Sequence, residues 1–288
     1  MNPAAGRGRT RRLLPRLEAA LDDLDVEVCV SRGPEEPERV ARRAAGDGRG
    51  IVACGGDGLV AILAGVAAET KTPLAVVPTG AGNDFARAIG LHPRRPLDAL
   101  GILRNGHERV VDLGRADHQW FTSVANTGFD AEANRWANTV HRISGTTLYL
   151  AAIARTLATF RPHRFRVAID DDEPEEFVAW LVAFANTQSY AGGMKIAPAA
   201  EVDDGLLNLT IIGPVGRGAF VWNLPRVATG SIAAHPKVTV RTGRSFEVAS
   251  LESDPAMEIY ASGERVGLLP ASVEVVPGAL RVITPTPA

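Results

Sequence analysis

Hydrophobic and polar positions follow two different rhythms along the chain, and the first covers its N-terminal part. Short apolar runs that end near Gly or Pro occur at residues 26–30, 51–54 and 74–77. Between them, apolar residues recur at helical spacing, as at Leu13, Leu17 and Leu21 and again over residues 59–68. Strands that alternate with such helices are typical of a parallel sheet covered by helices. We therefore predict an α/β domain with a parallel sheet over residues 1–115.

The second rhythm begins near residue 116 and consists mainly of short strands. The predicted strands cover residues 165–169, 177–185, 206–212, 237–241, 272–276 and 280–283. One helical stretch, residues 131–160, interrupts them, and Phe85 is the only aromatic residue before Trp120. The pattern predicts a β-rich sandwich or barrel-like domain over residues 116–288. We leave open that its last strand returns to the first domain.

Composition and charge narrow the class of protein. The 288 residues are 45% hydrophobic and 22% charged, which is ordinary for a globular protein. No apolar run approaches the ~20 residues that cross a bilayer, and the Arg-rich N-terminus does not read as a secretory signal, so we expect a cytoplasmic location. A formal net charge of −2 gives no field that would gather nucleic acid. Cys29 and Cys54 lie in apolar runs and predict buried free thiols rather than a disulfide or a metal site.

The strongest local motif is Gly55-Gly56-Asp57-Gly58, which joins an apolar run to a helical one. Glycine lets backbone N–H groups approach a ligand closely, and a helix N-terminus favours an anion, so this turn is suited to a phosphate. The alternative is a tight turn in which Asp57 caps the following helix. Similar turns occur at residues 2–8 and 78–84. Because ligands bind outside the carboxyl ends of parallel strands, three such turns at one edge favour a ligand site.

These motifs and others farther along the chain resemble the diacylglycerol kinase catalytic-domain family, the soluble bacterial lipid kinases with their sphingosine-kinase and ceramide-kinase relatives. The resemblance rests on the order and spacing of Asn2-Pro3 with Gly6, Gly55-Gly56-Asp57-Gly58, Gly80 with Asn83-Asp84-Phe85-Ala86-Arg87, Asn126-Thr127-Gly128-Phe129-Asp130, Pro198-Ala199-Ala200, Asp203-Asp204-Gly205-Leu206-Leu207 and Gly263-Glu264. It implies an N-terminal nucleotide-binding α/β domain, a C-terminal β-sandwich domain and a cleft between them where ATP meets a lipid hydroxyl.

The resemblance also implies roles for individual residues. The residues implied to line the ATP site are Asn2, Pro3, Ala4, Ala5, Gly6, Ser31, Gly55, Gly56, Asp57, Gly58, Leu59, Val60, Ala61 and Ala81. Magnesium (Mg²⁺) is expected at Glu201, Asp204 and Leu206, partly through backbone carbonyls. Glu264 matches the proton acceptor, and Asp57 is the competing base. Phosphoryl transfer needs a phosphate loop, a cation and a carboxylate near the attacking hydroxyl.

Taken without the family, two of these assignments have plainer interpretations. Glu264 reads as a surface carboxylate in a hairpin turn. Asp203-Asp204-Gly205 reads as a turn that leads into a strand. Both alternatives stay open at this point.

Several positions depart from the family pattern. Thr, Asn and Glu are usual after the glycine turn, where this chain has Leu59, Ala61 and Ile62. Ala81 stands in place of a Thr, and Ser262 in place of an Asp two residues before the expected base. The family also has an apolar strand before Asn-Pro. We expect an upstream in-frame start that supplies it, because losing a central strand leaves backbone groups unpaired.

The leading hypothesis is an ATP-dependent lipid kinase that converts diacylglycerol to phosphatidic acid. The rivals are a non-catalytic nucleotide- or lipid-binding relative and an NAD kinase, which shares the glycine turn but for which the expected Asn-Asn-Glu segment is absent. The lipid substrate would be met at the membrane surface, during transient peripheral contact. The stretch 131–160, with Trp136, is the candidate contact surface unless it is an ordinary packing helix. The identity of the lipid and a homodimer stay open.

Overall fold

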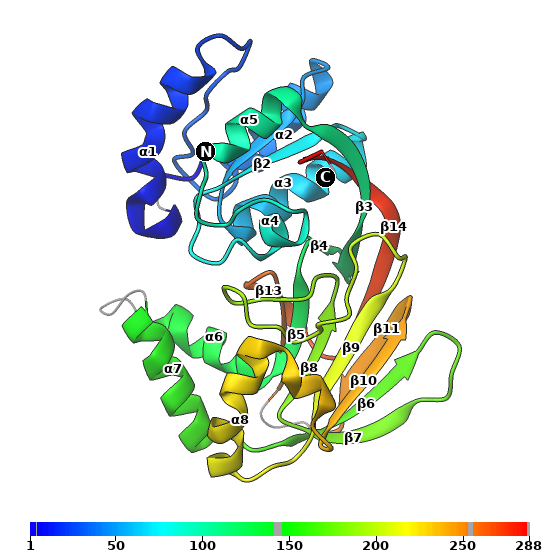
Figure 1. The fold of residues 1–288 in the computed structure, drawn as a ribbon. Helices are drawn as coiled ribbons and strands as arrows, with labels where there is room; N and C mark the ends of the chain where they lie inside the picture. The colour runs from blue at the N-terminus through cyan, green and yellow to red at the C-terminus, as the bar shows by residue number, and fades with distance from the viewer. Residues whose placement is uncertain (4, 141–145, 253–255, 287–288) are drawn as a thin grey trace.

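The computed structural model describes residues 1–3, 5–140, 146–252 and 256–286, and Figure 1 shows the path of the chain. The helices are α1 Ala5–Leu21, α2 Glu36–Gly46, α3 Asp57–Thr70, α4 Asp84–Ala88, α5 Asp98–Asn105, α6 Phe129–Thr139, α7 Thr146–Thr159, α8 Arg217–Thr229 and the short 3-10 helix η1 Ser231–Ala234. Helices α1 to α5 gather in the upper part of the molecule, and α6 to α8 in the lower part. Within the described ranges, no helix is both long and apolar enough to cross a membrane.

Two sheets form the framework. The strands are β1 Ile51–Gly55, β2 Leu74–Pro78, β3 His107–Ala116, β4 Gln119–Phe121, β5 Val124–Gly128, β6 His163–Ile169, β7 Glu175–Ala179, β8 Leu181–Ala185, β9 Leu207–Ile212, β10 Val238–Gly243, β11 Ser245–Ser250, β12 Glu258–Ala261, β13 Glu264–Leu268 and β14 Ala271–Thr284. One sheet has the order β1-β2-β14-β11-β6-β7, with β3 beside β14 and β4 beside β3. The other has the order β10-β9-β8-β5-β12-β13 and is antiparallel throughout. The predicted fold class is confirmed: an α/β half with parallel strands and a β-sandwich-like half.

Strand β14 joins the two halves. Its first residues pair antiparallel with β11, and near its end Val282 pairs parallel with Leu74 of β2. Along most of its length it also pairs with β3. The last strand of the chain therefore returns to the strands of the first half, and one continuous sheet runs through both.

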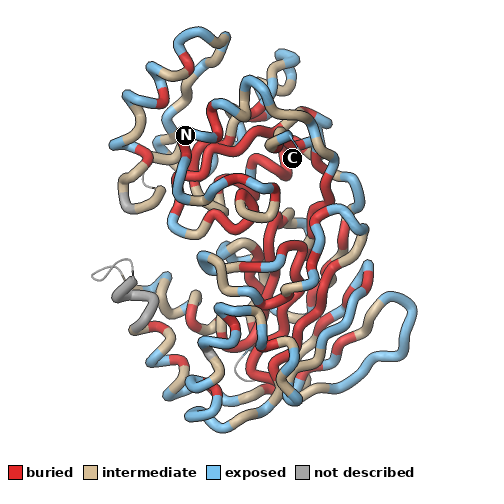
Figure 2. Tube along the Cα trace, in the orientation of Figure 1, coloured by how far each residue is buried: buried red, intermediate tan, exposed pale blue. Residues whose placement is uncertain are grey.

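Each half has its own core. In the first, α3 buries Val60 and Leu63 against β1, β2 and β14. In the second, Trp180, Phe184 and Phe246 are among the largest fully buried side chains. Figure 2 shows the buried segments following the strands through the middle of the molecule. Removal of this apolar surface from water is the main force that holds the sheets and helices together.

Most predicted elements of the second half are present, with changed connections. The run 177–185 divides at Trp180 into β7 and β8, which belong to different sheets. The two runs after residue 271 form one strand, β14, with an irregular register between Val276 and Leu280. The predicted helical stretch 131–160 is two helices, α6 and α7, and residues 141–145 between them lie outside the described residues.

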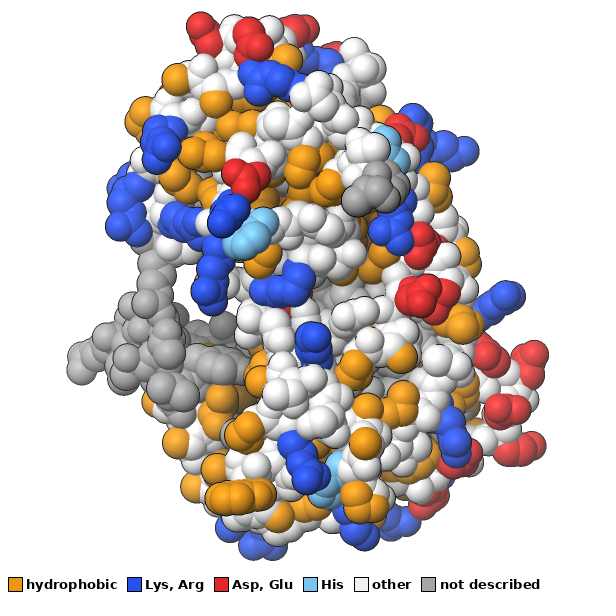
Figure 3. All heavy atoms as spheres, in the orientation of Figure 1, with side chains coloured by type: hydrophobic (Ala, Val, Ile, Leu, Met, Phe, Trp, Pro, Cys, Tyr) orange, Lys and Arg blue, Asp and Glu red, His pale blue; other side chains and the backbone are white. Residues whose placement is uncertain are grey.

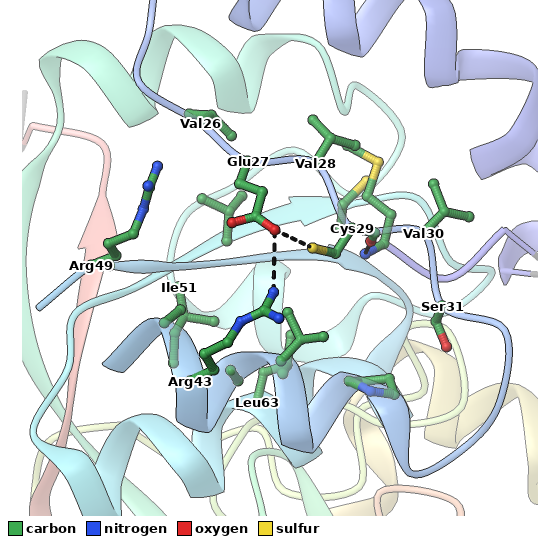
Figure 4. Close-up of a pocket in the computed structure, with 18 of the residues that line it drawn as sticks. Val26, Glu27, Val28, Cys29, Val30, Ser31, Arg43, Arg49, Ile51 and Leu63 are labelled. Carbon is green, nitrogen blue, oxygen red and sulfur yellow. Dashed lines mark hydrogen bonds and ion pairs between the residues drawn. The ribbon is translucent and has the colours of Figure 1, made fainter. Parts of the chain in front are cut away.

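The predicted strand at residues 26–30 is wrong, because this segment has no ladder of hydrogen bonds with a neighbour in the part of the chain that the structure describes. A groove of about 400 Å³ separates it from β1. Figure 4 shows Val26, Val28 and Val30 along one wall of this groove, and Ile51 and Leu63 along the other. Paired strands lie about 4.8 Å apart, so an apolar run held across a groove stays extended without becoming part of a sheet.

Candidate functional site

The three predicted glycine turns pack against one another. The N–H groups of Thr79 and Gly80 donate to the carbonyl of Gly55, at 3.0 and 3.1 Å. A Cβ built on Gly80 would lie 2.4 Å from the Cα of Gly56. Gly6 has a φ of +57°, and a Cβ there would lie 2.2 Å from the carbonyl oxygen of Thr79. These glycines are therefore needed for contact between the turns themselves.

Asp57 fastens the second turn to the third. Its Oδ2 accepts the N–H of Asn83 at 2.7 Å, and its Oδ1 accepts those of Asp84 at 2.7 Å and Phe85 at 3.4 Å. Burial raises the pKa of the Asp57 carboxyl, the charge of Asp84 adds to the rise, and the three backbone donors oppose it. Asp57 does not cap its own helix, where the N-cap is Gly56 without a side-chain bond. Its carboxylate instead binds the first turn of α4, and its ATP contact and role as a base stay predictions.

Asp84 links the two halves, a role that sequence reasoning missed. This buried carboxylate accepts the hydroxyl of Ser189 at 2.9 Å and the N–H of Gly192 at 2.7 Å. Arg87 forms an ion pair with it at 2.6 Å. The motif at residues 83–87 marked this segment as part of the resemblance, but no local pattern indicated that its partners lie about a hundred residues away.

Glu264 reaches across to the glycine turn. It begins β13 after a hairpin turn at Ser262 and Gly263, whose φ values are +49° and +87°. Ser262 anchors this turn by donating its N–H to the carbonyl of Val124 at 3.0 Å. A Cβ built on Gly58 would lie 3.2 Å from Glu264 Oε1. The carboxylate predicted as the base and the turn predicted to hold phosphate therefore meet, although they come from opposite halves.

The remaining predicted ATP residues of the second and third turns differ in orientation. The side chains of Leu59, Val60 and Ala61 are buried, and Leu59 and Val60 belong to the core of the first half. The N–H of Val60 already donates to the carbonyl of Gly56 at 3.0 Å, so a backbone contact with a nucleotide would come from the N–H groups of the residues before it in the first turn of α3. Ala81 is exposed at the tip of the third turn.

The first turn is bonded to the end of β1 and to the segment before α2. Asn2 donates its N–H to the carbonyl of Cys54 at 3.1 Å, and Ser31 donates its N–H to the carbonyl of Met1 at 2.9 Å. Pro3 is half-buried, Ala5 begins α1, and Ala4 lies outside the described residues. The Ser31 side chain donates to the carbonyl of Gly33 and lines the groove beside β1.

The residues predicted for magnesium lie in the segment before β9. Glu201 and Asp204 are exposed, and Asp204 accepts the N–H of Leu206 at 3.0 Å. Partial loss of hydration raises the pKa of Asp204, and the charges of Asp112 and Glu201 add to the rise. The oxygen donors suit magnesium in kind, yet within the described ranges no three His, Cys, Asp or Glu side chains converge to hold a metal ion. As placed, these residues do not form a complete ligand set, and the site stays a prediction.

An apolar pocket occupies the second half, between the antiparallel sheet and α6 to α8. Its lining includes Phe129, Ile153, Met194, Ile212, Phe220 and Val227. Asn223, His235 and Lys237 also line it, together with a hydrogen-bonded pair in which the Tyr190 hydroxyl donates to Asp130 Oδ2. Burial raises the pKa of Asp130, and the Tyr190 hydrogen bond opposes the rise. The loop that carries Tyr190 also carries Ser189 and Gly192, so the pocket and the contacts of Asp84 share one loop.

The comparisons with known proteins agree with this arrangement. Residues 1–116 match the diacylglycerol kinase catalytic domain, and residues 123–284 match the YegS C-terminal NAD kinase beta sandwich-like domain. A Mycobacterium tuberculosis (strain H37Rv) protein named diacylglycerol kinase is 32% identical over 292 residues, covering 99% of this chain and 93% of the relative. A Chromohalobacter salexigens protein named probable lipid kinase YegS-like is 33% identical over 209 residues, covering 70% of this chain and 66% of the relative.

A solved structure shares the fold along nearly the whole chain. It is that of a diacylglycerol kinase from Bacillus anthracis str. Sterne, with a TM-score of 0.70 at 20% identity, and the match covers 98% of this chain and 94% of that one. The fold, the matches to both halves and the 32% identity to a full-length relative agree with one another. The chain therefore belongs to the diacylglycerol kinase catalytic-domain family.

Proposed function

We propose that this protein is an ATP-dependent lipid kinase that transfers the γ-phosphate of ATP to a lipid hydroxyl, with diacylglycerol as the acceptor and phosphatidic acid as the product. Membership of the family and the relatives named diacylglycerol kinase support the reaction class. The observation that carries the proposal is the approach of Glu264 Oε1 to Gly58, 3.2 Å from the position of a Cβ there. It gives one site a carboxylate from one half and a glycine turn from the other.

The start of α3 is suited to the phosphates of ATP. The first N–H groups of a helix have no partners within the helix, and the helix dipole favours an anion there. Gly58 has no side chain to keep a phosphate away, while Leu59 and Val60 anchor the helix in the core. Phosphate would thus be held by the main chain of a rigid helix, which fits a turn that lacks the hydroxyl and carboxylate side chains usual in the family.

The surroundings of Glu264 support its proposed role as the proton acceptor. Within the described part of the chain, no hydrogen bond or ion pair occupies its carboxylate. In the transfer step the lipid O–H proton passes to Glu264 while the oxygen forms a bond to the γ-phosphorus. The bond from that phosphorus to the β,γ-bridging oxygen breaks, and ADP leaves with its electron pair. Magnesium, when bound, would offset phosphate charge, and we assign it no step.

The apolar pocket supports a lipid as the acceptor. Most of its lining is aliphatic and aromatic, and polar groups that can fix a ligand's orientation come from the Asp130–Tyr190 pair and from Asn223, His235 and Lys237. Tyr190 of the pocket lies on the loop whose Ser189 and Gly192 bond Asp84, so the pocket is connected to the junction with the first half. The proposal requires that acyl chains held in the pocket leave the glycerol hydroxyl free to reach Glu264 and the glycine turn.

The decisive experiment is an assay with labelled ATP and a panel of acceptors: diacylglycerols of several chain lengths, sphingosine, ceramide and NAD. We expect phosphate transfer to diacylglycerol, whereas transfer to NAD or to no acceptor would overturn the proposal in favour of one of the rivals. Ile153→Trp would narrow the pocket and should shift preference toward shorter acyl chains. Val178→Trp, at an exposed position of β7, is the matched control and should leave the preference unchanged.

A further inference from the structure

Helix α8 has two apolar faces, and only one of them is covered. Phe220 and Val227 face inward and line the apolar pocket. On the other face, Trp222 is 84% exposed and Val221 is 45% exposed. By contrast, Trp180 is 2% exposed. An aromatic ring of this size in water leaves a large apolar area without a partner, and such a surface marks an interaction site.

The segment around α8 is also unusually basic. The chain holds 33 acidic residues, yet none occurs between Gly205 and Phe246. The same segment holds Arg217 and Arg226 in α8, both exposed, and Lys237 just after η1. In Figure 3, hydrophobic and basic side chains predominate over the lower part of the molecule around α8, and acidic side chains gather instead at the β6–β7 hairpin.

We propose that α8 is the surface that docks on an anionic lipid bilayer, with Trp222 inserted at the interface and Arg217 and Arg226 beside the headgroups. Tryptophan favours the boundary between headgroups and acyl chains, and basic residues are attracted to anionic lipids. The inference rests on the proposed function, because a diacylglycerol acceptor resides in the bilayer. The pocket lies directly behind α8, so docking there would give the acyl chains a short path from the membrane.

The surface predicted from the sequence, around Trp136, fits a bilayer less well. Trp136 is half-buried, and the Arg155 guanidinium covers its ring at 5.5 Å from the ring centre. Glu132 forms ion pairs with both Arg135 and Arg155, so part of the charge of these two arginines is neutralised. We therefore place the membrane contact on α8 and use Trp136 as the comparison.

Co-sedimentation of the full chain with phosphatidylcholine vesicles, with and without phosphatidylglycerol, tests the proposal. Trp222→Ala should lower the partition coefficient for anionic vesicles at least about tenfold. Arg217→Glu with Arg226→Glu should do the same, and salt should weaken wild-type binding because it screens surface charge. The matched controls are Trp136→Ala and, in the exposed basic stretch of α1, Arg12→Glu with Arg16→Glu. Equal losses in the controls, or undiminished binding of the α8 variants, would overturn the proposal.

Two further measurements separate this inference from the proposed function. Lipids with brominated acyl chains should quench tryptophan fluorescence in the wild type more than in Trp222→Phe, and equal quenching would refute insertion. With diacylglycerol dispersed in detergent, the Trp222→Ala variant should phosphorylate diacylglycerol as fast as the wild type does.

If the wild type binds vesicles through Trp222 but phosphorylates no lipid, the docking surface stands and the kinase proposal fails. If Trp222→Ala instead dissociates a dimer in sedimentation and leaves vesicle binding intact, α8 binds a second copy and the membrane role is wrong.

Discussion

Replacement of Glu264 by Gln tests the reaction chemistry most directly. The two side chains have nearly the same size, and Glu264 is exposed, so the stability of the fold should change by no more than about 0.5 kcal/mol. Gln cannot accept the proton of the attacking hydroxyl. A positioned general base contributes about 10² to 10⁴ in rate, which corresponds to about 2.7 to 5.5 kcal/mol in the activation free energy at about 1.36 kcal/mol per factor of ten.

The measurement combines turnover with nucleotide affinity. In Glu264→Gln we expect kcat and kcat/KM for the lipid to fall together by at least about 100-fold. The Kd for ATP should change less than about threefold, because Gly58 and the main chain of α3, not Glu264, are proposed to hold the phosphates. Glu247→Gln, at an exposed position of β11, is the control and should retain full turnover. Near-normal turnover in Glu264→Gln would remove it from the mechanism and leave Asp57 as the base.

Three other perturbations follow from the same geometry. Asp57→Asn leaves at least one of three backbone N–H groups without its acceptor, so the free energy of unfolding should fall by about 1–3 kcal/mol. The exposed control Asp47→Asn should keep the wild-type melting temperature, and an equally unchanged melting temperature in Asp57→Asn would contradict the prediction. Gly58→Ala should weaken ATP binding without lowering the melting temperature, because its Cβ would meet only the end of the Glu264 side chain. Gly80→Ala would place a Cβ 2.4 Å from the Cα of Gly56 and should destabilise the fold, so equal effects on stability would refute the distinction. Burial raises the pKa of Cys54 to about 11. The protonated thiol should therefore contribute its full share to the free energy of unfolding below its ordinary pKa, and that contribution should decline, by up to about 2–3 kcal/mol, as the pH rises toward 11. In denaturant titrations at a series of pH values, Cys54→Ala should lose this pH dependence.

Local sequence patterns predicted most of the helices and strands whose own residues are enough to define them. Helix α3 and the strands β6, β9 and β10 have strong periodicity or continuous apolar character and lie where expected. Elements whose pairing depends on residues far away in the sequence were harder to predict. The apolar run 177–185 is one stretch in sequence, but its halves join different sheets, and the division falls at the buried Trp180. The run 26–30 has strand composition but no partner, since composition does not determine which segment will lie alongside.

The sequence predicted which residues form the candidate site, but not the contacts between them. The glycine turns and Glu264 came from motifs, together with the family pattern that connects them. The same motifs did not indicate that Asp57 would bind the N–H groups of the third turn, or that Gly6, Gly56 and Gly80 would serve contacts between turns. Asp84 shows the limit most clearly. Its partners Ser189 and Gly192 belong to the other half, and a carboxylate's partner across such a distance is fixed only by the folded topology.

That topology also explains how two separate halves can hold the proposed site together. Glu264 stands on the antiparallel sheet and Gly58 on a helix of the α/β half, so their approach depends on the junction between the halves. One part of the junction is β14, a single strand that pairs with strands of both halves. The other part is polar and consists of the buried Asp84 with its partners Ser189 and Gly192. A strand shared by both halves resists large rotation, whereas a few hydrogen bonds can open and close at low cost. The junction should therefore adjust by small movements around the Asp84 contacts, while the pairing of β14 with strands of both halves limits how far the half that carries Glu264 can rotate away from the glycine turn.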